Sequence, residues 1–211
     1  ERWISGWLDV AEQLAAGRAR VIAGKRAPTS TLLADSAARL RRLARQHDGL
    51  RIVTENWHAL LPDSSAVIEL LDELAESARL IGAVNCAVRR EQRWIGENTD
   101  GQGFLASLRT LTEPEGQRVL ILGAGGAARA IAVELALAGA TELWVANRNV
   151  AKASEIAALV NAETACACRA IEWQSELAVP ASATVVVNAT SLGLPGSGEV
   201  PLSFDTVPLG L

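Results

Sequence analysis

An apolar run that leads directly into a glycine-rich turn constrains the fold of this chain more than any other feature. Residues 119–122 read Val-Leu-Ile-Leu, and residues 123–130 read Gly-Ala-Gly-Gly-Ala-Ala-Arg-Ala. Such a run is typical of a buried strand, and the alanine-rich segment after it favours a helix. Glycines permit a sharp turn that lets a pyrophosphate approach the backbone, and the N–H groups at the helix start can then bind phosphate. The segment predicts a dinucleotide-binding βαβ start, with candidate cofactor-binding residues Gly123, Ala124, Gly125, Gly126 and Ala127.

The end of the next predicted strand indicates which dinucleotide is bound. Enzymes that use NAD carry an Asp or Glu there, which accepts from the ribose 2′-hydroxyl and would repel a 2′-phosphate. This chain has Asn147, Arg148 and Asn149 instead, with Lys152 one turn later. Arg148 and Lys152 can neutralise a 2′-phosphate and Asn147 can donate to it, which favours NADP(H). The alternative is that both cations only begin a surface helix, although cations are unfavourable in a first helical turn without a bound anion.

Residues 101–211 alternate predicted strands and helices, which favours a parallel sheet. We expect an α/β fold: a Rossmann-type doubly wound parallel sheet in residues 101–211 and a smaller α/β substrate-binding domain in residues 1–100. Strands are predicted at 118–122, 141–146, 165–167 (weak) and 184–188, and helices at 101–112, 127–138 and 150–161.

The N-terminal half has a less regular pattern. Residues 7–48 have helical periodicity with a break at 24–28, and the part from 31 to 48 predicts an amphipathic helix with a solvated arginine face. Helical spacing over 63–81 ends at Gly82, a residue common at helix C-termini. Strands are predicted at 50–54, 83–88 and 94–95, the last two joined by a polar hairpin.

Composition excludes several classes of partner. The formal net charge is −4 and no Lys/Arg-rich run occurs, so no nucleic-acid partner is expected. No apolar run reaches the roughly 18–20 residues of a membrane span, and charges are mixed through the first twenty residues, so we expect a cytoplasmic protein without a membrane partner. Cys86, Cys166 and Cys168 suit buried or half-buried thiols rather than a disulfide, and no metal site is expected.

Four segments occur together in an order that resembles one family. They are Gly-Ala-Val-Asn at 82–85, Gly-Glu-Asn-Thr-Asp-Gly at 96–101, the glycine turn with its Asn-Arg-Asn partner, and Val-Asn-Ala-Thr-Ser-Leu-Gly at 187–193. From about residue 66 to residue 193 the chain resembles shikimate dehydrogenase. Glutamyl-tRNA reductase shares the glycine turn and a similar strand end but lacks the second and fourth segments.

The resemblance implies NADPH-dependent, reversible reduction of 3-dehydroshikimate to shikimate in a cleft between the two domains. We expect a monomer or homodimer. Asn85 and Asp100 would bind the substrate's hydroxyls, and Asp100 would be half of a catalytic Lys-Asp pair. Asn188, Thr190 and Ser191 would lie along the cofactor. Two structural alternatives remain open. Residues 98–101 could cap a helix without binding substrate, and residues 188–190 could end a strand without contacting the cofactor.

The N-terminal third departs from the family pattern. Alignment backward from residue 66 places the family's catalytic lysine on Ser64, and no lysine lies nearby. His58 and Lys25 are candidate replacements, and residues 29–31 (Thr-Ser-Thr) could stand in for the serines that bind the substrate carboxylate. After Asp205 the family continues with further strands and a helix. The alternatives are therefore a non-catalytic homologue that binds the cofactor or a pathway ligand, and a dehydrogenase for quinate or aminoshikimate.

Overall fold

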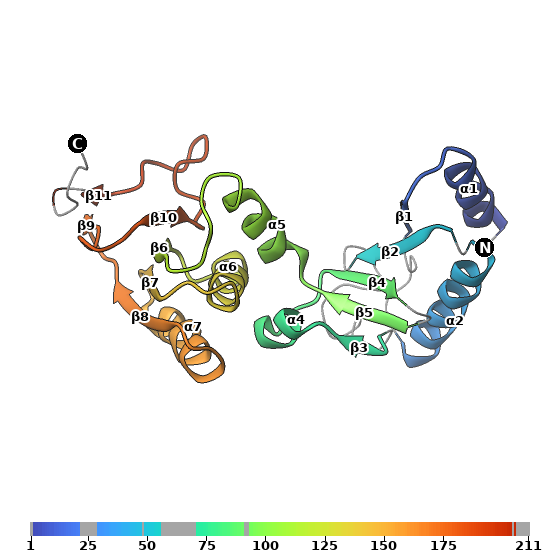
Figure 1. Cartoon of the computed structure of the whole chain (residues 1–211), viewed down its shortest axis with the longest axis horizontal. Helices are drawn as coiled ribbons and strands as arrows, with labels where there is room; N and C mark the ends of the chain where they lie inside the picture. The colour runs from blue at the N-terminus through green and yellow to red at the C-terminus, as the bar shows by residue number, and fades with distance from the viewer. Residues whose placement is uncertain are drawn as a thin grey trace. The chain divides into compact units, whose positions relative to one another are not determined.

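The computed structural model describes residues 2–21, 29–47, 49–55, 71–90, 93–203 and 205. The chain divides into two compact units, Glu1–Thr99 and Asp100–Leu211, called unit 1 and unit 2 below (Figure 1).

Unit 2 is built on a four-stranded parallel sheet. Its strands run in the order β10-β6-β7-β8, and their bounds are β6 Arg118–Leu122, β7 Glu142–Asn147, β8 Ala167–Glu172 and β10 Val185–Asn188. All four residues from Val119 to Leu122 are fully buried. A central strand of a parallel sheet is covered on both faces, which explains why this run is apolar at every position and not at alternate ones.

Three helices cover one face of this sheet: α5 Thr99–Leu108, α6 Gly126–Leu137 and α7 Val150–Glu163 (Figure 1). The core beneath them joins Leu105 of α5, Leu135 of α6 and Ile156 of α7 to Ile121 and Val145 of the sheet. The helices predicted at 101–112, 127–138 and 150–161 are confirmed with shifted ends.

The opposite face of the sheet is covered without a helix among the described residues. Leu120, Leu122 and Trp144 face a cluster that includes Trp173 and Val179 from the segment after β8. Two short strands, β9 Leu177–Ala178 and β11 Leu202–Ser203, pair in parallel within this covering segment. Neither strand was predicted, because two-residue strands leave no periodicity.

Unit 1 contains a mixed five-stranded sheet in the order β1-β2-β4-β5-β3. The β4-β5 pair is the predicted antiparallel hairpin, and β3 joins β5 in parallel at the edge. The strands are β1 Arg18–Arg20, β2 Arg51–Glu55, β3 Glu73–Leu74, β4 Cys86–Arg90 and β5 Arg93–Glu97, and the helices are α1 Arg2–Gln13, α2 Ser30–Gln46 and α4 Glu76–Ile81.

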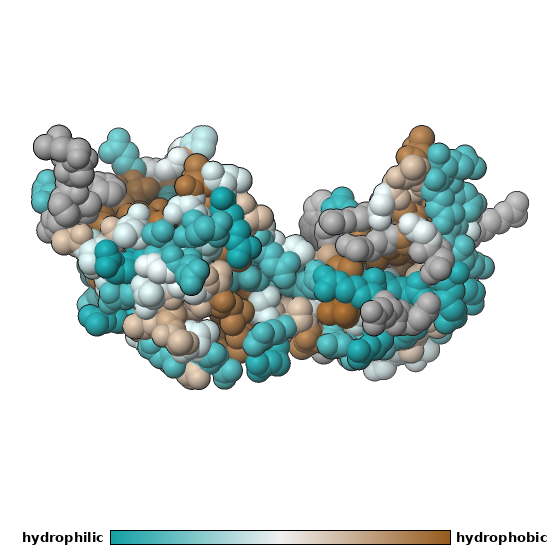
Figure 2. Space-filling model, in the orientation of Figure 1, coloured by the Kyte–Doolittle hydropathy of each residue, from teal (hydrophilic) through white to brown (hydrophobic). Residues whose placement is uncertain are grey.

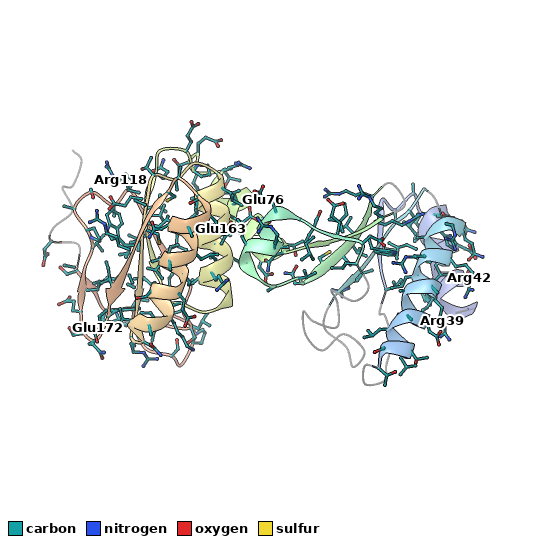
Figure 3. The ribbon with its side chains drawn as sticks, turned by 90° about the horizontal axis from the view of Figure 1, so that it is seen from below. Arg39, Arg42, Glu76, Arg118, Glu163 and Glu172 are labelled. Carbon is teal, nitrogen blue, oxygen red and sulfur yellow. The ribbon has the colours of Figure 1, made fainter. Side chains whose placement is uncertain are left out.

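Helix α2 has the predicted amphipathic character. The Thr29 side chain accepts from the Leu32 N–H and caps its start, while Leu33, Leu40 and Leu43 are buried. Arg39 and Arg42 project away from the sheet, and the surface over α2 is largely hydrophilic (Figures 2 and 3). The solvated arginine face is confirmed.

Two element predictions are wrong. The helix predicted over 63–81 is helical only from Glu76 within its described part, because residues 72–74 join the sheet instead. The Asp72 N–H donates to the Trp94 carbonyl, and the Asp72 carboxylate accepts from the Trp94 N–H. The weak strand predicted at 165–167 is the six-residue β8, which begins only at Ala167. In both cases pairing with a neighbouring strand overrides local propensity.

None of the described helices has the length and apolar character needed to cross a membrane.

A close approach of α5 to α6 gives a stability prediction. A Cβ added at Gly101 would lie 2.7 Å from the Ala130 carbonyl oxygen and from the Glu134 Cγ, whereas at Gly103 it would meet nothing within 4 Å. Gly101→Ala should destabilise the protein by about 1–3 kcal/mol through overpacking. Gly103→Ala, on the same helix, should stabilise it by up to about 1 kcal/mol through helix propensity. Urea unfolding followed by circular dichroism measures both, and equal effects of the two substitutions would contradict the packing argument.

Candidate functional site

The turn after β6 has a backbone that only glycine adopts easily. Gly123 has φ +103°, and its N–H donates to the Ala146 carbonyl at 2.7 Å. A Cβ at this position would also come within 3.0 Å of the Ala189 carbonyl oxygen and the Thr190 methyl group. Gly123 therefore lets the loops after β6 and β10 approach each other.

The next residues of this turn leave the start of α6 open. Gly125 caps α6 without any side-chain hydrogen bond, and a Cβ at Gly125 or Gly126 would meet nothing within 4 Å. The first N–H groups of a helix have no partner within the helix and carry a partial positive charge. Ala128 is fully buried, which seats the helix on the sheet. The turn thus offers exposed N–H donors to an anion.

This open turn lies where the strand order of unit 2 reverses. β7 and β8 lie on one side of β6, and β10 lies on the other. Leu122 and Asn188 are register partners at the carboxyl ends of β6 and β10. Ligands of open α/β sheets bind outside the carboxyl ends of the strands at such a switch point. Gly123 and the segment from Asn188 to Ser191 are therefore neighbours at the expected ligand position.

The loop after β7 presents cations while its asparagines hold it in place. Asn147 Nδ2 donates to the Asn149 carbonyl at 2.9 Å, and Asn149 Oδ1 accepts from the Ala151 N–H and caps α7. Arg148 and Lys152 are exposed, and no carboxylate pairs with either within the part of the chain that the structure describes. Asn147 and Asn149 thus have a structural role that the sequence alone did not separate from ligand binding.

Trp173 and Gln174, directly after β8, support this loop, and the sequence analysis did not predict this role. Gln174 Nε2 donates to Glu172 Oε1 at 2.8 Å and lies 3.4 Å from the Arg148 carbonyl oxygen. The Trp173 N–H donates to the Asn147 carbonyl. Glu172 and Arg118 are labelled at opposite ends of the sheet in Figure 3. Extending the predicted strand at 165–167 to its real end would have placed residues 172–174 beside Arg148.

Residues 188–192 form a turn stabilised by their own side chains. Asn188 Oδ1 accepts from the N–H and from the hydroxyl of Thr190, while Asn188 Nδ2 donates to the Leu192 carbonyl at 2.7 Å. Thr190 Oγ1 also accepts from the Leu192 N–H. These bonds shape the loop opposite Gly123. Ser191 is exposed and free to bind a ligand in the described structure.

In unit 1, Asn85 joins the segment at 82–85 to the segment at 96–101. Its Oδ1 accepts from the Thr99 N–H at 2.9 Å and from the Thr99 hydroxyl at 3.2 Å. The Asn85 N–H donates to the Glu97 carbonyl, and the buried Asn98 side chain donates to the Ala83 carbonyl. Asn85 Nδ2 has no hydrogen-bond partner in the described structure. Asp100 follows Thr99 and is exposed in the first turn of α5.

The segments predicted to carry the proton donor and the carboxylate-binding group are only partly described. Lys25, His58 and Ser64 lie outside the described residues. Of the Thr-Ser-Thr segment, Thr29 serves as the cap of α2. The roles expected for the individual site residues stay predictions.

The cysteines are buried or half-buried thiols, as expected. Cys86 is half-buried, and Cys166 and Cys168 are buried. Burial raises the pKa of Cys166 to about 11 and that of Cys168 to about 12. Thiolates are the reactive form of cysteine, so Cys166 and Cys168 are inert near neutral pH.

Comparison with known proteins identifies the family that these motifs resemble. Residues 106–195 match the family model described as Shikimate / quinate 5-dehydrogenase. The shikimate dehydrogenase (NADP(+)) of Desulforamulus reducens is 42% identical over 149 residues, which are 67% of this chain and 50% of that protein. That of Methanopyrus kandleri is 43% identical over 150 residues, 67% of this chain and 51% of its own. This chain resembles shikimate dehydrogenases. It spans about half the length of these curated relatives.

Solved structures give the same fold. The ligand-free 5-ketofructose reductase of Gluconobacter sp. strain CHM43 superposes with a TM-score of 0.69 and 44% identity, covering 85% of this chain and 62% of that one. The shikimate 5-dehydrogenase of Thermus thermophilus, in complex with NADP(H) and shikimate, has a TM-score of 0.53 and 32% identity, covering 82% of this chain and 59% of that one. The expected Rossmann-type α/β fold of the shikimate dehydrogenases is confirmed.

The two buried thiols predict a loss of stability at alkaline pH. Their pKa values are raised in the folded chain, whereas an unfolded cysteine titrates near about 8.5. The folded state therefore keeps protons that the unfolded state releases, and this stability is complete below about pH 8.5 and is lost as pH rises toward 11–12. Urea midpoints between pH 8 and pH 11 should fall less steeply in a Cys166→Ala/Cys168→Ala variant. Parallel curves for variant and parent would contradict this account.

Proposed function

We propose that this chain is a shikimate dehydrogenase-like oxidoreductase that reversibly reduces 3-dehydroshikimate to shikimate with NADPH. The observation that carries the proposal is the open glycine turn after β6, next to the loop after β7 whose Arg148 and Lys152 are exposed and have no carboxylate partner among the described residues. The curated relatives support it, since those described above are named shikimate dehydrogenase (NADP(+)). They also favour an enzyme over the non-catalytic alternative.

The residues of unit 2 fit NADP(H). Gly125 and Gly126 leave room for a pyrophosphate against the first N–H groups of α6. The exposed Arg148 and Lys152 provide positive charge for a 2′-phosphate, and no acidic residue occupies the position after β7 where NAD enzymes carry one. Lys152 lies in the first turn of α7, where an unneutralised cation opposes the helix dipole. A bound phosphate would remove this repulsion.

The chain's own groups would orient the substrate and supply a proton. NADPH, when bound, supplies a hydride to the ketone carbon. Asn85 can donate to a substrate hydroxyl through its free Nδ2, while its Oδ1 keeps the start of α5 and thereby Asp100 in place. The ketone oxygen needs a proton as its negative charge develops. The lysines of this sequence are Lys25 and Lys152, and Lys152 belongs to α7 in unit 2. We propose Lys25 or His58 as the donor.

A second candidate substrate is 5-ketofructose. The 5-ketofructose reductase of Gluconobacter is 44% identical and matches 85% of this chain. Both candidate reactions reduce a ketone next to a hydroxyl-bearing carbon, and the same Asn85 and Asp100 groups could bind either substrate. The difference lies in the carboxylate of 3-dehydroshikimate, which needs a donor group that the sugar does not need.

We further propose that residues 1–100 form the substrate domain and residues 101–211 the cofactor domain of a cytoplasmic monomer or homodimer. We propose that it binds a small-molecule substrate and neither nucleic acid nor a membrane.

One assay separates the two substrates. The purified chain would be mixed with NADP⁺ and shikimate or quinate, or with NADPH and 5-ketofructose, while absorbance of the reduced nicotinamide is followed. We expect turnover with shikimate to be fastest. Faster turnover with 5-ketofructose would support the second candidate, and NADPH binding without turnover of any substrate would contradict both.

Removing the cations after β7 should change the choice of cofactor. Arg148→Ala and Lys152→Ala should each weaken NADPH binding about 10- to 100-fold and leave NADH binding nearly unchanged, because a hydrogen bond to a charged group contributes roughly 1.5–3 kcal/mol. Fluorescence titration of both reduced cofactors measures this.

A control for the cofactor prediction is Arg109→Ala. Arg109 pairs with Glu113 just before the turn into β6, at the amino edge of the sheet. This variant should bind NADPH like the parent. Equal loss of NADH affinity in the Arg148 and Lys152 variants would contradict a 2′-phosphate site.

Asp100 should affect turnover without affecting cofactor binding. Asp100→Asn should lower kcat/KM for the substrate about a hundredfold or more, the usual size of an acid–base contribution. NADPH affinity should not change. Glu113→Gln, an exposed acidic control beyond the end of α5, should keep full activity. Full activity in Asp100→Asn would remove Asp100 from the site.

A further inference from the structure

A buried histidine faces two carboxylates at the junction of α1 and α2 in unit 1. His47 is 3% exposed and follows the last residue of α2. Asp9 and Glu12 are three residues apart on α1 and therefore lie on one face of that helix. His47 Nδ1 is 3.1 Å from Glu12 Oε2 and 3.8 Å from Asp9 Oδ1. No part of the proposed dehydrogenase chemistry uses these groups.

The histidine side chain lacks a geometrically acceptable hydrogen bond. Neither ring nitrogen of His47 has a hydrogen-bond partner in the described structure, although both are buried. A buried polar group without a hydrogen-bond partner costs free energy, so such groups usually bind a protein group, an ordered water or an ion. Here the atoms facing Nδ1 are carboxylate oxygens, which offer an ion pair only when the ring is protonated.

Two backbone hydrogen bonds hold the main chain at His47. The His47 N–H donates to the Leu43 carbonyl, and the His47 carbonyl accepts from the Leu50 N–H. Leu8 of α1 packs into the same core cluster as Leu43 and Leu50, which fixes α1 beside the end of α2. Both helices that carry the three groups are therefore held in place by packing that is independent of any ion.

The spacing of the three groups matches the ligand shell of a transition metal. One ligand atom from each residue can be chosen so that all three lie within 4.8 Å of one another. Ligands about 2.1 Å from a tetrahedral ion are roughly 3.4 Å apart, which lies between the observed separations of 3.1 and 3.8 Å. Imidazole with two carboxylates suits Zn²⁺ and related divalent ions, and the two carboxylate charges would neutralise the ion.

We propose that Asp9, Glu12 and His47 form a binding site for a divalent transition-metal ion that fastens α1 to the end of α2. The Asp9 and Glu12 side chains are 59% and 38% exposed, so water can complete the coordination and the ion can enter from solvent. The site is structural and does not depend on the proposed function. It differs from the expectation from the sequence that no metal is bound.

Cobalt titration of the full chain tests this site. Metal-free protein should bind one equivalent of Co²⁺ with the visible absorption of a tetrahedral site and without the near-ultraviolet thiolate band that cysteine ligands would give. Zn²⁺ should displace the Co²⁺ and raise Tm, because an ion that binds only the folded state stabilises it. Glu12→Gln and His47→Gln should each bind Co²⁺ at least about tenfold more weakly, since even supporting residues of metal sites have effects of this size.

Matched variants make the outcome decisive. Asp35→Asn removes an exposed carboxylate from α2 away from the site and should bind Co²⁺ like the parent. Glu12 is partly exposed, so its variant should fold even where substitution of the buried His47 prevents folding. Absence of Co²⁺ binding by the parent, or equal affinity in parent and Glu12→Gln, would overturn the proposal.

Discussion

The close contact of the loops that follow β6 and β10 is the constraint on which the candidate cofactor site depends. It requires a residue without a side chain at Gly123, because a Cβ there would press against the Ala189 backbone. The same residue turns the chain at a positive φ and sends it into α6 with open N–H groups at the helix start. The reversal of strand order, the tight turn and the start of α6 thus all occur at Gly123, the switch point of the sheet.

Much of unit 2 could be predicted because its signals are local and redundant. The apolar run at 119–122 is buried on both faces, and an apolar run of this length followed by glycines is typical of a central parallel strand. The polar residues that follow β7 and β10 could be predicted as well, because they come directly after recognisable strands in the sequence. The structure adds a distinction that the sequence lacked: Asn147 and Asn149 hold the loop that displays Arg148 and Lys152.

The sequence failed where pairing between distant segments determines the local conformation. Residues 72–74 have a helical pattern, yet Asp72 bonds to Trp94 through both its N–H and its carboxylate. Gln174 was overlooked because its partners, Glu172 and Arg148, come together only once β7 and β8 are in register. The contact of His47 with Asp9 and Glu12 of α1 was also missed, because these residues are far apart in sequence and periodicity predicts only local structure.

The covering of the second sheet face has a consequence for local opening. Helices fasten one face of unit 2, but the other rests on the two-residue strands β9 and β11, which share few backbone hydrogen bonds. Segments with so few bonds open first in native-state exchange. Trp173 and Gln174 belong to this segment and contact the loop that carries Arg148. An anion held by that loop would therefore slow amide exchange at Trp173 and Gln174, so ligand affinity and local unfolding are thermodynamically linked there.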